Sequence, residues 1–281
     1  MRPGLGITLT VVATLCFALL DTVSQYLGPA VPVLMMVWIR YLTQASMTTA
    51  LLLPQHGRTL WHTRMPLWQL LRALLMVGSN TLAFLSLQLV PVGELTAIGM
   101  LVPLLVTVLA ALLLGEHVPR IGWVLVAGGL AGALMVVRPK GGGLHAGLLL
   151  PLLLVLVNAS YQVVTSRMVR TEHPGTTHFY TGIIGLVCCS LLLPWGWQPM
   201  AQPKLWALAA LVGLLGSIGH YLLIRAYSLA PAARLTPFLY AQVVFATLTG
   251  WLAFGHTPDR WTVLGIALIL LCGWLGTRLR R

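Results

Sequence analysis

Hydrophobic residues fill most of the chain, in long runs that are separated by short polar stretches. A helix of about 20 apolar residues crosses the hydrocarbon core of a bilayer, which is about 30 Å thick, and most of the runs reach that length. The shorter segments of alternating polarity that a membrane β-barrel requires do not occur. Glycine and proline separate the runs, as turns between spans require. We therefore predict an all-α integral membrane protein with ten transmembrane helices, over roughly 7–26, 31–53, 67–89, 93–114, 120–138, 147–167, 175–194, 204–228, 232–254 and 259–278.

The second half of the sequence repeats the first at a constant difference in residue number, which we call the repeat offset. The repeat offset maps Pro91 onto Pro231, for example, and Gly115 onto Gly255. This self-similarity predicts a duplicated architecture. Each copy holds five predicted spans, an odd number, so the second copy should enter the membrane in the opposite direction. Inverted repeats of this kind have two packings of similar energy, which is the usual basis of alternating access. The predicted domains are two inverted five-helix repeats, over residues 1–140 and 141–281.

The composition supports a membrane protein and limits its partners. Hydrophobic residues make up 58% of the chain, charged residues 8%, and the mean hydropathy is +0.90, well outside the balance of soluble domains. The 17 Lys and Arg residues stand singly at the ends of apolar runs. They form no basic face with interleaved aromatic residues, so nucleic acid is not an expected partner. Eleven of them, with Arg72 among these, fall on one side of the predicted spans and four on the other. This asymmetry predicts a multi-pass protein of the bacterial inner membrane with both termini in the cytoplasm.

Motifs for other kinds of chemistry are missing from the sequence. There is no GxxxxGK[ST] phosphate loop, so the chain by itself should not couple ATP to transport. No HExxH motif, no CxxC pair and no convincing Ser/His/Asp set occurs, which argues against an enzyme. The four cysteines lie inside predicted spans, where we interpret them as small apolar residues. We expect no cofactor and no metal site.

Several short motifs resemble one family of membrane proteins. They are Trp38-Ile39-Arg40-Tyr41, Leu89-Val90-Pro91-Val92-Gly93-Glu94, Pro103, Leu112-Leu113-Leu114-Gly115-Glu116 and Arg138-Pro139. With these residues, essentially the whole chain resembles the drug/metabolite transporter superfamily, in its EamA-type branch of two tandem five-helix repeats. The second half departs from the family pattern at Val243, where proline is common, and at His256, where a Gly-Glu pair is usual.

The resemblance implies a function and the place of its site. Members of the branch are secondary transporters with a central cavity lined by spans 1, 3, 4, 6, 8 and 9. Their substrates include amino acids, nucleotide-like cofactors and metallophores, and the chain further resembles the subgroup of riboflavin, S-adenosylmethionine and opine-metallophore carriers. Export is the commoner direction among bacterial relatives. The expected partners are a small polar or amphipathic metabolite, the lipid bilayer and, as one alternative, a coupling proton. A non-transporting membrane interaction protein or accessory subunit is the alternative function.

Polar residues inside the spans are the candidates for the site, because an ionisable side chain at membrane depth is costly and is usually retained for function. In the first and sixth spans such residues recur three or four apart, which places them on one helical face. The repeat offset relates Asp21 to Tyr161 and Asn80 to His220, so repeat-related helices should direct polar faces toward one centre. The candidate substrate-binding or proton-coupling residues are Asp21, Gln25, Arg40, Asn80, Phe84, Asn158, Tyr161, Gln162, His220 and Tyr227.

Each candidate has a structural alternative. Asp21 is predicted to bind the substrate or a proton, or else to form an ion pair with Arg40. The amides and tyrosines of the sixth span could serve only as helix-to-helix hydrogen bonds, which contribute about 0.6 kcal/mol on average in membranes. Gate or structural roles are predicted for Glu94, Glu116 and Arg234. Glycines in spans 5 and 10 predict close helix packing and suit either a monomer or a weak homodimer through these two spans.

Overall fold

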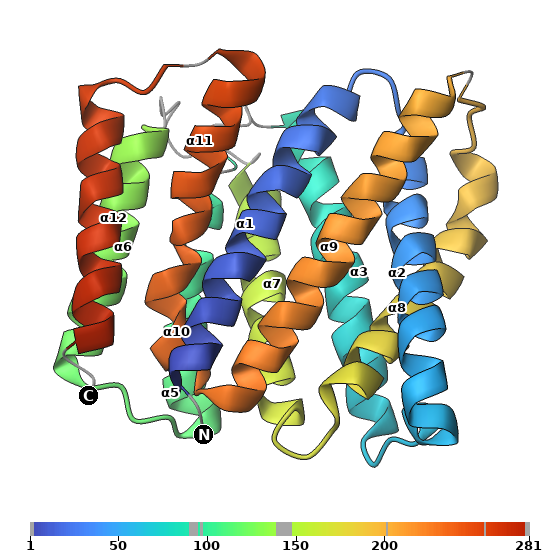
Figure 1. The fold of residues 1–281 in the computed structure, drawn as a ribbon, viewed down its shortest axis with the longest axis horizontal. Coiled ribbons are helices and arrows are strands. Elements are labelled where there is room, and N and C mark those ends of the chain that lie inside the picture. Colours follow the sequence, from blue (N-terminus) through green and yellow to red (C-terminus); the bar gives the residue numbers. More distant parts are fainter. Residues whose placement is uncertain are drawn as a thin grey trace.

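The computed structural model describes residues 3–89, 95, 98–138, 148–200, 202–255 and 257–278, which form a bundle of helices (Figure 1). No strand occurs among these residues. Both termini of the described chain lie at the lower end of the bundle in Figure 1. The helices are α1 (Pro3–Leu27), α2 (Val33–His56), η1 (Gly57–Trp61), α3 (Pro66–Leu89), α5 (Val102–Leu114), α6 (Arg120–Val137), α7 (Leu149–Met168), α8 (Pro174–Leu192), η3 (Leu193–Trp195), α9 (Pro203–Leu229), α10 (Ala232–Leu239), α11 (Ala241–Phe254) and α12 (Arg260–Arg278).

Proline and glycine set several of the helix ends. Helices α3, α8 and α9 begin at a proline, which lacks the N–H that would be unsatisfied in a first turn anyway. Helix α5 ends at Gly115 and α11 at Gly255, and both glycines adopt the left-handed conformation, with φ of 63° and 72°. Side chains disfavour that conformation, so glycine suits these caps. The two caps are related by the repeat offset and therefore repeat a local structure as well as a sequence.

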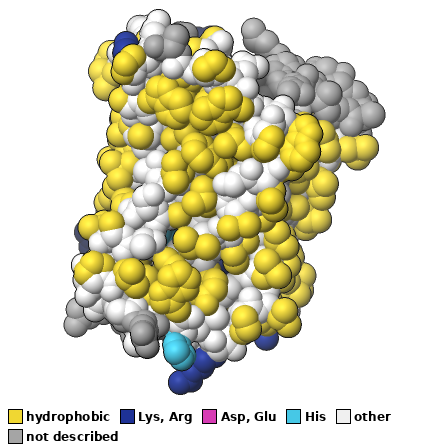
Figure 2. All heavy atoms as spheres, turned by 90° about the vertical axis from the view of Figure 1, so that its right-hand side faces the viewer, with side chains coloured by type: hydrophobic (Ala, Val, Ile, Leu, Met, Phe, Trp, Pro, Cys, Tyr) yellow, Lys and Arg dark blue, Asp and Glu magenta, His cyan; other side chains and the backbone are white. Residues whose placement is uncertain are grey.

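The exterior has the character expected of a membrane protein. Figure 2 shows one face covered largely by hydrophobic side chains, with basic side chains mainly toward its ends. Leu112, Trp195 and Leu252 are 74%, 82% and 80% exposed, and apolar exposure on this scale indicates contact with lipid rather than water. Within the described chain, seven helical segments are long and apolar enough to cross a membrane: α1, α6, α7, α8 with η3, α9, α10 with α11, and α12.

The count of ten spans stays a prediction. Helices α2 and α3 are 24 residues long but are not among the seven apolar segments. These two helices carry Arg40, Arg72 and Asn80, which are buried or half-buried inside the bundle. Both helices thus carry polar side chains that face inward. In the described part of the fourth predicted span, α5 contributes 13 helical residues, and Leu95, Ile98 and Gly99 are also helical.

Two predicted spans are interrupted at equivalent positions. The span predicted over 93–114 contains a turn at Met100 and Leu101, and the span predicted over 232–254 breaks at Tyr240 between α10 and α11. The repeat offset relates Met100 to Tyr240. Pro103 accounts for the first break, because proline cannot donate to the carbonyl of Gly99 and would clash with it in a continuous helix. The second break forms although Val243 occupies the position equivalent to Pro103.

Helices of the first half pack mainly on helices of the second. Helix α1 packs on α9, α3 on α7, α2 on α8 and α6 on α12. The repeat offset relates α1 to α7, α3 to α9, α2 to α8 and α6 to α12. The α1–α9 and α3–α7 contacts are therefore equivalent, and each of the other two contacts joins a helix to its own equivalent. The core is thus formed between the halves rather than within each one.

The glycines of α6 and α12 are used within the chain. A Cβ atom at Gly132 would lie 2.7 Å from the carbonyl oxygen of Gly265, and one at Gly265 would lie 2.5 Å from the carbonyl oxygen of Gly132. Neither position can carry a larger side chain without displacing the backbone opposite. The predicted close packing therefore occurs between these two helices of one chain, and a homodimer through them remains a prediction.

Candidate functional site

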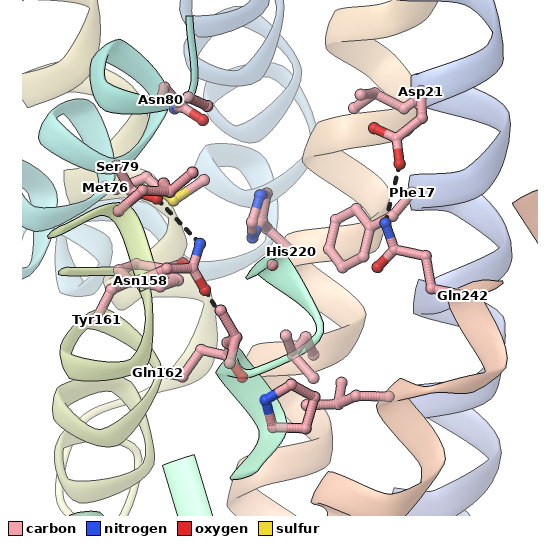
Figure 3. A pocket seen from close by; sticks show the side chains of 18 of the residues that line it. Phe17, Asp21, Met76, Ser79, Asn80, Asn158, Tyr161, Gln162, His220 and Gln242 are labelled. Carbon is pink, nitrogen blue, oxygen red and sulfur yellow. Dashed lines mark hydrogen bonds between the residues drawn. The ribbon is translucent and has the colours of Figure 1, made fainter. Parts of the chain in front are cut away.

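A cavity of about 340 Å³ lies between the two halves of the bundle (Figure 3). Its volume falls within the usual range of small-molecule sites. Residues of α1, α3, α7 and α9 line it, together with residues on either side of both helix breaks. These segments correspond to predicted spans 1, 3, 4, 6, 8 and 9, and α2 adds Arg40. The polar lining residues are Asp21, Arg40, Ser79, Asn80, Asn158, Tyr161, Gln162, His220 and Gln242.

The structure brings together most of the predicted site residues. Seven of the ten substrate or proton candidates line the cavity. Tyr227 is buried beside it, and Gln25 is exposed one turn beyond Asp21 without lining it. The side chain of Phe84 lies outside the described part of the chain. Two further lining residues, Ser79 and Gln242, bond directly to residues of the predicted set.

Asp21 faces the cavity from α1. Its Oδ2 accepts a hydrogen bond of 2.9 Å from Nε2 of Gln242, near the start of α11. Among the described residues, the ion pairs are Arg138 with Asp259 and Arg170 with Glu116. The alternative of a direct ion pair between Asp21 and Arg40 is therefore not formed in this structure. Among the described residues, the neutral amide of Gln242 is the only group that bonds to this carboxylate.

Arg40 reaches the cavity from α2 and is also held by neutral groups. Its Nη1 donates to Oδ1 of Asn80 at 3.3 Å, and its Nη2 donates to Nε2 of His220 at 2.7 Å. Because a guanidinium can only donate, Nε2 of His220 must be the accepting nitrogen. Nδ2 of Asn80 donates in turn to the hydroxyl of Tyr41 at 2.8 Å. A Cβ atom at Gly216 of α9 would lie 3.0 Å from Nε of Arg40, so glycine there makes room for the guanidinium.

The amides of α7 form a directed chain of hydrogen bonds. The hydroxyl of Tyr227 donates to Oε1 of Gln162 at 2.6 Å, Nε2 of Gln162 donates to Oδ1 of Asn158 at 2.8 Å, and Nδ2 of Asn158 donates to Oγ of Ser79 at 3.0 Å. The chain connects α9, α7 and α3, and Figure 3 shows its bonds between Gln162, Asn158 and Ser79. These bonds are the helix contacts that a purely structural role predicts, but Gln162, Asn158 and Ser79 also line the cavity.

Aromatic rings form part of the same wall. The ring centroids of Phe17 and His220 are 4.8 Å apart, and those of Tyr161 and His220 are 6.0 Å apart in an edge-to-face arrangement. Such pairs favour offset or edge contacts over direct stacking. The cavity thus combines an aromatic surface with hydrogen-bonding groups, as a site for an amphipathic molecule requires.

Arg72 corrects a sequence prediction. The sequence pattern groups it with the basic residues at the cytoplasmic span ends, yet its side chain is fully buried. Nε donates to Oγ1 of Thr165 at 2.7 Å, Nη2 donates to the hydroxyl of Tyr161 at 2.8 Å, and Nη1 contacts the carbonyl of Thr177 at 3.0 Å and Oγ1 of Thr181. The sequence hints at this burial only through Thr177 and Thr181, which lie four residues apart and offer acceptors on one face of α8.

The gate candidates lie at one end of the bundle, away from the cavity. Oε1 of Glu116 forms an ion pair of 2.7 Å with Arg170, and its Oε2 accepts a hydrogen bond of 3.0 Å from the backbone N–H of Ala233 in the first turn of α10. A carboxylate at a helix N-terminus also interacts favourably with the helix dipole. Arg234 lines a second cavity of about 340 Å³ with His117. Glu94 lies outside the described residues.

An all-helical bundle with an apolar exterior, interrupted helices and a polar cavity between its halves has the architecture of a membrane carrier. A comparison with protein families identifies which one. The EamA-like transporter family matches the chain twice, over residues 4–138 and 145–275. The chain belongs to this family, within the drug/metabolite transporter superfamily.

Relatives of known function are similar over most of their length. A riboflavin transporter of Rhizobium johnstonii is 30% identical, over 96% of this chain and 89% of the relative. An S-adenosylmethionine uptake transporter of Rickettsia bellii is 26% identical, over 89% of this chain and 85% of the relative. The pseudopaline exporter CntI of Pseudomonas aeruginosa is 25% identical, over 95% and 93%. A crystal structure with 20% sequence identity matches with a TM-score of 0.86 over 98% of each chain, which confirms the fold.

Proposed function

We propose that the protein is a secondary transporter that moves a small polar or amphipathic metabolite across the bacterial inner membrane by alternating access. The observation that carries the proposal is the polar cavity, which both halves line and which lies beside both helix breaks. Interrupted helices commonly border the substrate sites of such carriers, because they supply local backbone freedom near the middle of the membrane. The names of the family and of its relatives as transporters support the proposal.

The two halves act, in this proposal, as inverted five-helix repeats over residues 1–140 and 141–281. The double match to the family and the exchange pattern of helix packing support this relation. So do the equivalent breaks at Met100 and Tyr240 and the equivalent left-handed caps at Gly115 and Gly255. Rocking of one repeat against the other would open the cavity to each side in turn.

One ion pair at each end of the bundle would form and break during that cycle. Glu116 and Arg170 join the halves at the end that holds the termini, and Arg138 and Asp259 join them at the opposite end (Figure 1). We assign the end with the termini to the cytoplasm. Arg72 is buried and no longer counts as a residue of the span ends, but ten basic residues still fall on this side of the predicted spans and four on the other. Export is the direction we propose. The exporter among the relatives supports it, whereas the uptake transporters show that the family permits the reverse.

Within the site, Asp21 binds a cationic or hydrogen-bonding group of the substrate or a coupling proton. Arg40, Asn80, Asn158, Tyr161, Gln162 and His220 fix the orientation of the substrate, and Tyr227 supports the amide chain. Glu116 and Arg234 serve the gate. The cavity position of Asp21 and its single bond to a neutral amide support its role.

The test is transport by purified protein in liposomes, with riboflavin, S-adenosylmethionine and a set of amino acids as radiolabelled solutes. Counterflow of at least one solute, which collapses in Asp21→Asn and persists in Glu172→Gln, is the expected result. Glu172→Gln is a matched control, because it also replaces a carboxylate by an amide, while Glu172 lies outside the cavity and outside the two ion pairs of the described residues. A folded protein that moves none of a broad metabolite panel would favour the accessory-subunit alternative instead.

A further inference from the structure

Two side chains of opposite charge face the central cavity without pairing. Asp21 and Arg40 are the only Asp, Glu, Lys or Arg residues among the described residues that line it. Neither belongs to an ion pair within the described part of the chain. A charge at membrane depth is costly when it is left without compensation. The two groups would relieve that cost by pairing, yet in this structure each is held by neutral partners.

The carboxylate keeps free binding capacity. Gln242 donates to Oδ2 of Asp21, and Oδ1 has no hydrogen-bond partner among the described residues. Asp21 is exposed on the inside of the cavity rather than enclosed by packing. An ionised carboxylate has about four acceptor sites, so most of its capacity remains open to a ligand.

The guanidinium is also only partly used. It has five N–H donors, of which one on Nη1 bonds to Asn80 and one on Nη2 bonds to His220. The Nε atom is buried against α9 and has no partner among the described residues. Each Nη atom therefore keeps a second hydrogen for a ligand. The planar fork of a guanidinium matches the two oxygens of a carboxylate.

The two charges come from different helices, Asp21 from α1 and Arg40 from α2. Figure 3 shows Asp21 and Asn80 on opposite sides of the cavity, with His220 between them. The Arg40 guanidinium bonds to Asn80 and His220, and the Asp21 carboxylate bonds to Gln242. The rings of Phe17, His220 and Tyr161 form an aromatic surface in the same cavity.

We propose that this cavity selects a zwitterion, with an ammonium group bound at Asp21, a carboxylate bound at Arg40 and an aromatic or heteroaromatic body against the rings of Phe17 and His220. The inference rests on the proposed transport function and names the substrate class of that same site. A ligand with one charge compensates only one of the two residues, and a neutral ligand compensates neither. A zwitterion compensates both and leaves the occupied cavity with no net charge.

Thermal stability of the purified protein in detergent measures this selectivity. One series keeps the indole ring and changes the charges: L-tryptophan, L-tryptophan amide and N-acetyl-L-tryptophan. A second series compares S-adenosyl-L-homocysteine, a zwitterion, with methylthioadenosine, which lacks the amino-acid group, and with riboflavin, which is uncharged. We expect the zwitterion of each series to raise Tm, by about 5 °C at a hundredfold excess over its Kd. Its singly charged or neutral analogues should raise Tm by less than a quarter of that.

Other outcomes overturn the inference. Equal stabilisation by N-acetyl-L-tryptophan would make the cavity an anion site, and equal stabilisation by L-tryptophan amide would make it a cation site. Preference for riboflavin or methylthioadenosine, or no response to either zwitterion, would exclude zwitterion selection. A solute that stabilises the protein is then loaded into proteoliposomes. Transport of a non-zwitterion would refute the inference but leave the proposed function standing, whereas a bound zwitterion that is not moved would refute transport alone.

The variant Asp21→Asn sharpens the test, since it removes one charge without changing the size of the side chain. It should weaken binding of the zwitterion at least tenfold and leave binding of N-acetyl-L-tryptophan unchanged or stronger, because Arg40 is then the only charge in the cavity. Glu172→Gln is the control, because Glu172 lies outside the cavity, and it should retain the preference of the unmodified protein. Equal weakening of both ligands in Asp21→Asn would show a general loss of structure and contradict the assignment.

Discussion

The two halves of the molecule share a scaffold but contribute different chemistry to the cavity. The first half supplies both charges, from Asp21 and Arg40. The residue equivalent to Asp21 is Tyr161, which lines the cavity but bonds to Arg72 through its hydroxyl. The residue equivalent to Arg40 is Tyr180, whose hydroxyl donates to the carbonyl of Trp61 outside the cavity.

This difference separates the requirements of folding from those of binding. Helix breaks, left-handed caps and interhelical packing are repeated at equivalent positions, as two halves with the same local fold require. The cavity residues are not repeated, which fits the proposal that a single asymmetric ligand meets different groups on each side. The second half therefore supplies amides, an imidazole and aromatic rings where the first supplies charges.

The largest loss of stability is expected at Arg72, which bonds the first half of the chain to the second. Arg72→Ala removes the guanidinium that donates to the hydroxyl groups of Tyr161, Thr165 and Thr181. These three hydroxyl groups then stay buried without that donor. Hydrogen bonds to charged groups contribute about 1.5–3 kcal/mol each, so we expect a loss of more than about 3 kcal/mol of stability. Thermal unfolding in detergent measures it. Arg170→Ala, in which the removed side chain is half-exposed, is the control. An equal loss in both variants would contradict the account of Arg72.

The second effect compares equivalent positions in the two halves. Asp21→Asn should reduce transport at least tenfold with little change in Tm, because the carboxylate makes only one hydrogen bond with the described part of the protein. Tyr161→Phe should lower Tm through its lost bond to Arg72 and change transport less. Initial rates in proteoliposomes and thermal unfolding are measured on both variants. Greater transport loss in Tyr161→Phe would mean that the chemistry is not concentrated in the first half.

A smaller effect is expected in the contact between α6 and α12. Gly132→Ala places a methyl group against the carbonyl of Gly265, and overpacking of this kind costs about 1–3 kcal/mol. Gly250→Ala on α11 is the control, because a Cβ atom there meets nothing within 4 Å. Unfolding experiments should separate the two variants. Unchanged stability of Gly132→Ala combined with loss of a dimer would instead place this glycine at an interface between chains.

The smallest effect concerns the ion pair at the end opposite the termini. Arg138 holds the pKa of Asp259 well below its usual range. A carboxyl whose pKa is lowered by folding stabilises the protein at any pH above its ordinary pKa. This stabilisation is lost as the pH falls through the lowered pKa. The difference in Tm between the unmodified protein and Asp259→Asn should thus be small and constant from pH 7 to about pH 5. A difference that disappears within that window would show that the pair does not persist.

The sequence predicted the membrane class, the family and the lining of the cavity by particular helices. Those predictions depended on long-range hydrophobicity and on motifs, which are properties of whole segments. Asp21 and Asn158 could be chosen because polar residues are rare in apolar spans and lie on one helix face.

Pairwise contacts were beyond sequence reasoning. The partner of Asp21 is Gln242 from the far end of the chain, and the partner of Arg40 is His220, although Asp21 and Arg40 themselves looked like a natural pair. Arg72 looked like a surface charge, because nothing local in the sequence shows that Thr165 and Thr181 surround it. The break at Tyr240 was not predicted either, since Val243 stands at the position equivalent to Pro103 and the nearby Pro237 lies inside α10.

Alternating access around Asp21 is the central claim, and thiol labelling of a single cysteine at that position tests it most directly. Cys16, Cys188, Cys189 and Cys272 are first replaced, and Asp21→Cys is exposed to a membrane-impermeant maleimide in right-side-out and inside-out vesicles. We predict labelling from both sides. Glu116→Gln should increase labelling from the cytoplasmic side, and Arg138→Gln should increase it from the other side. Labelling from one side only, unchanged by both substitutions, would contradict the account.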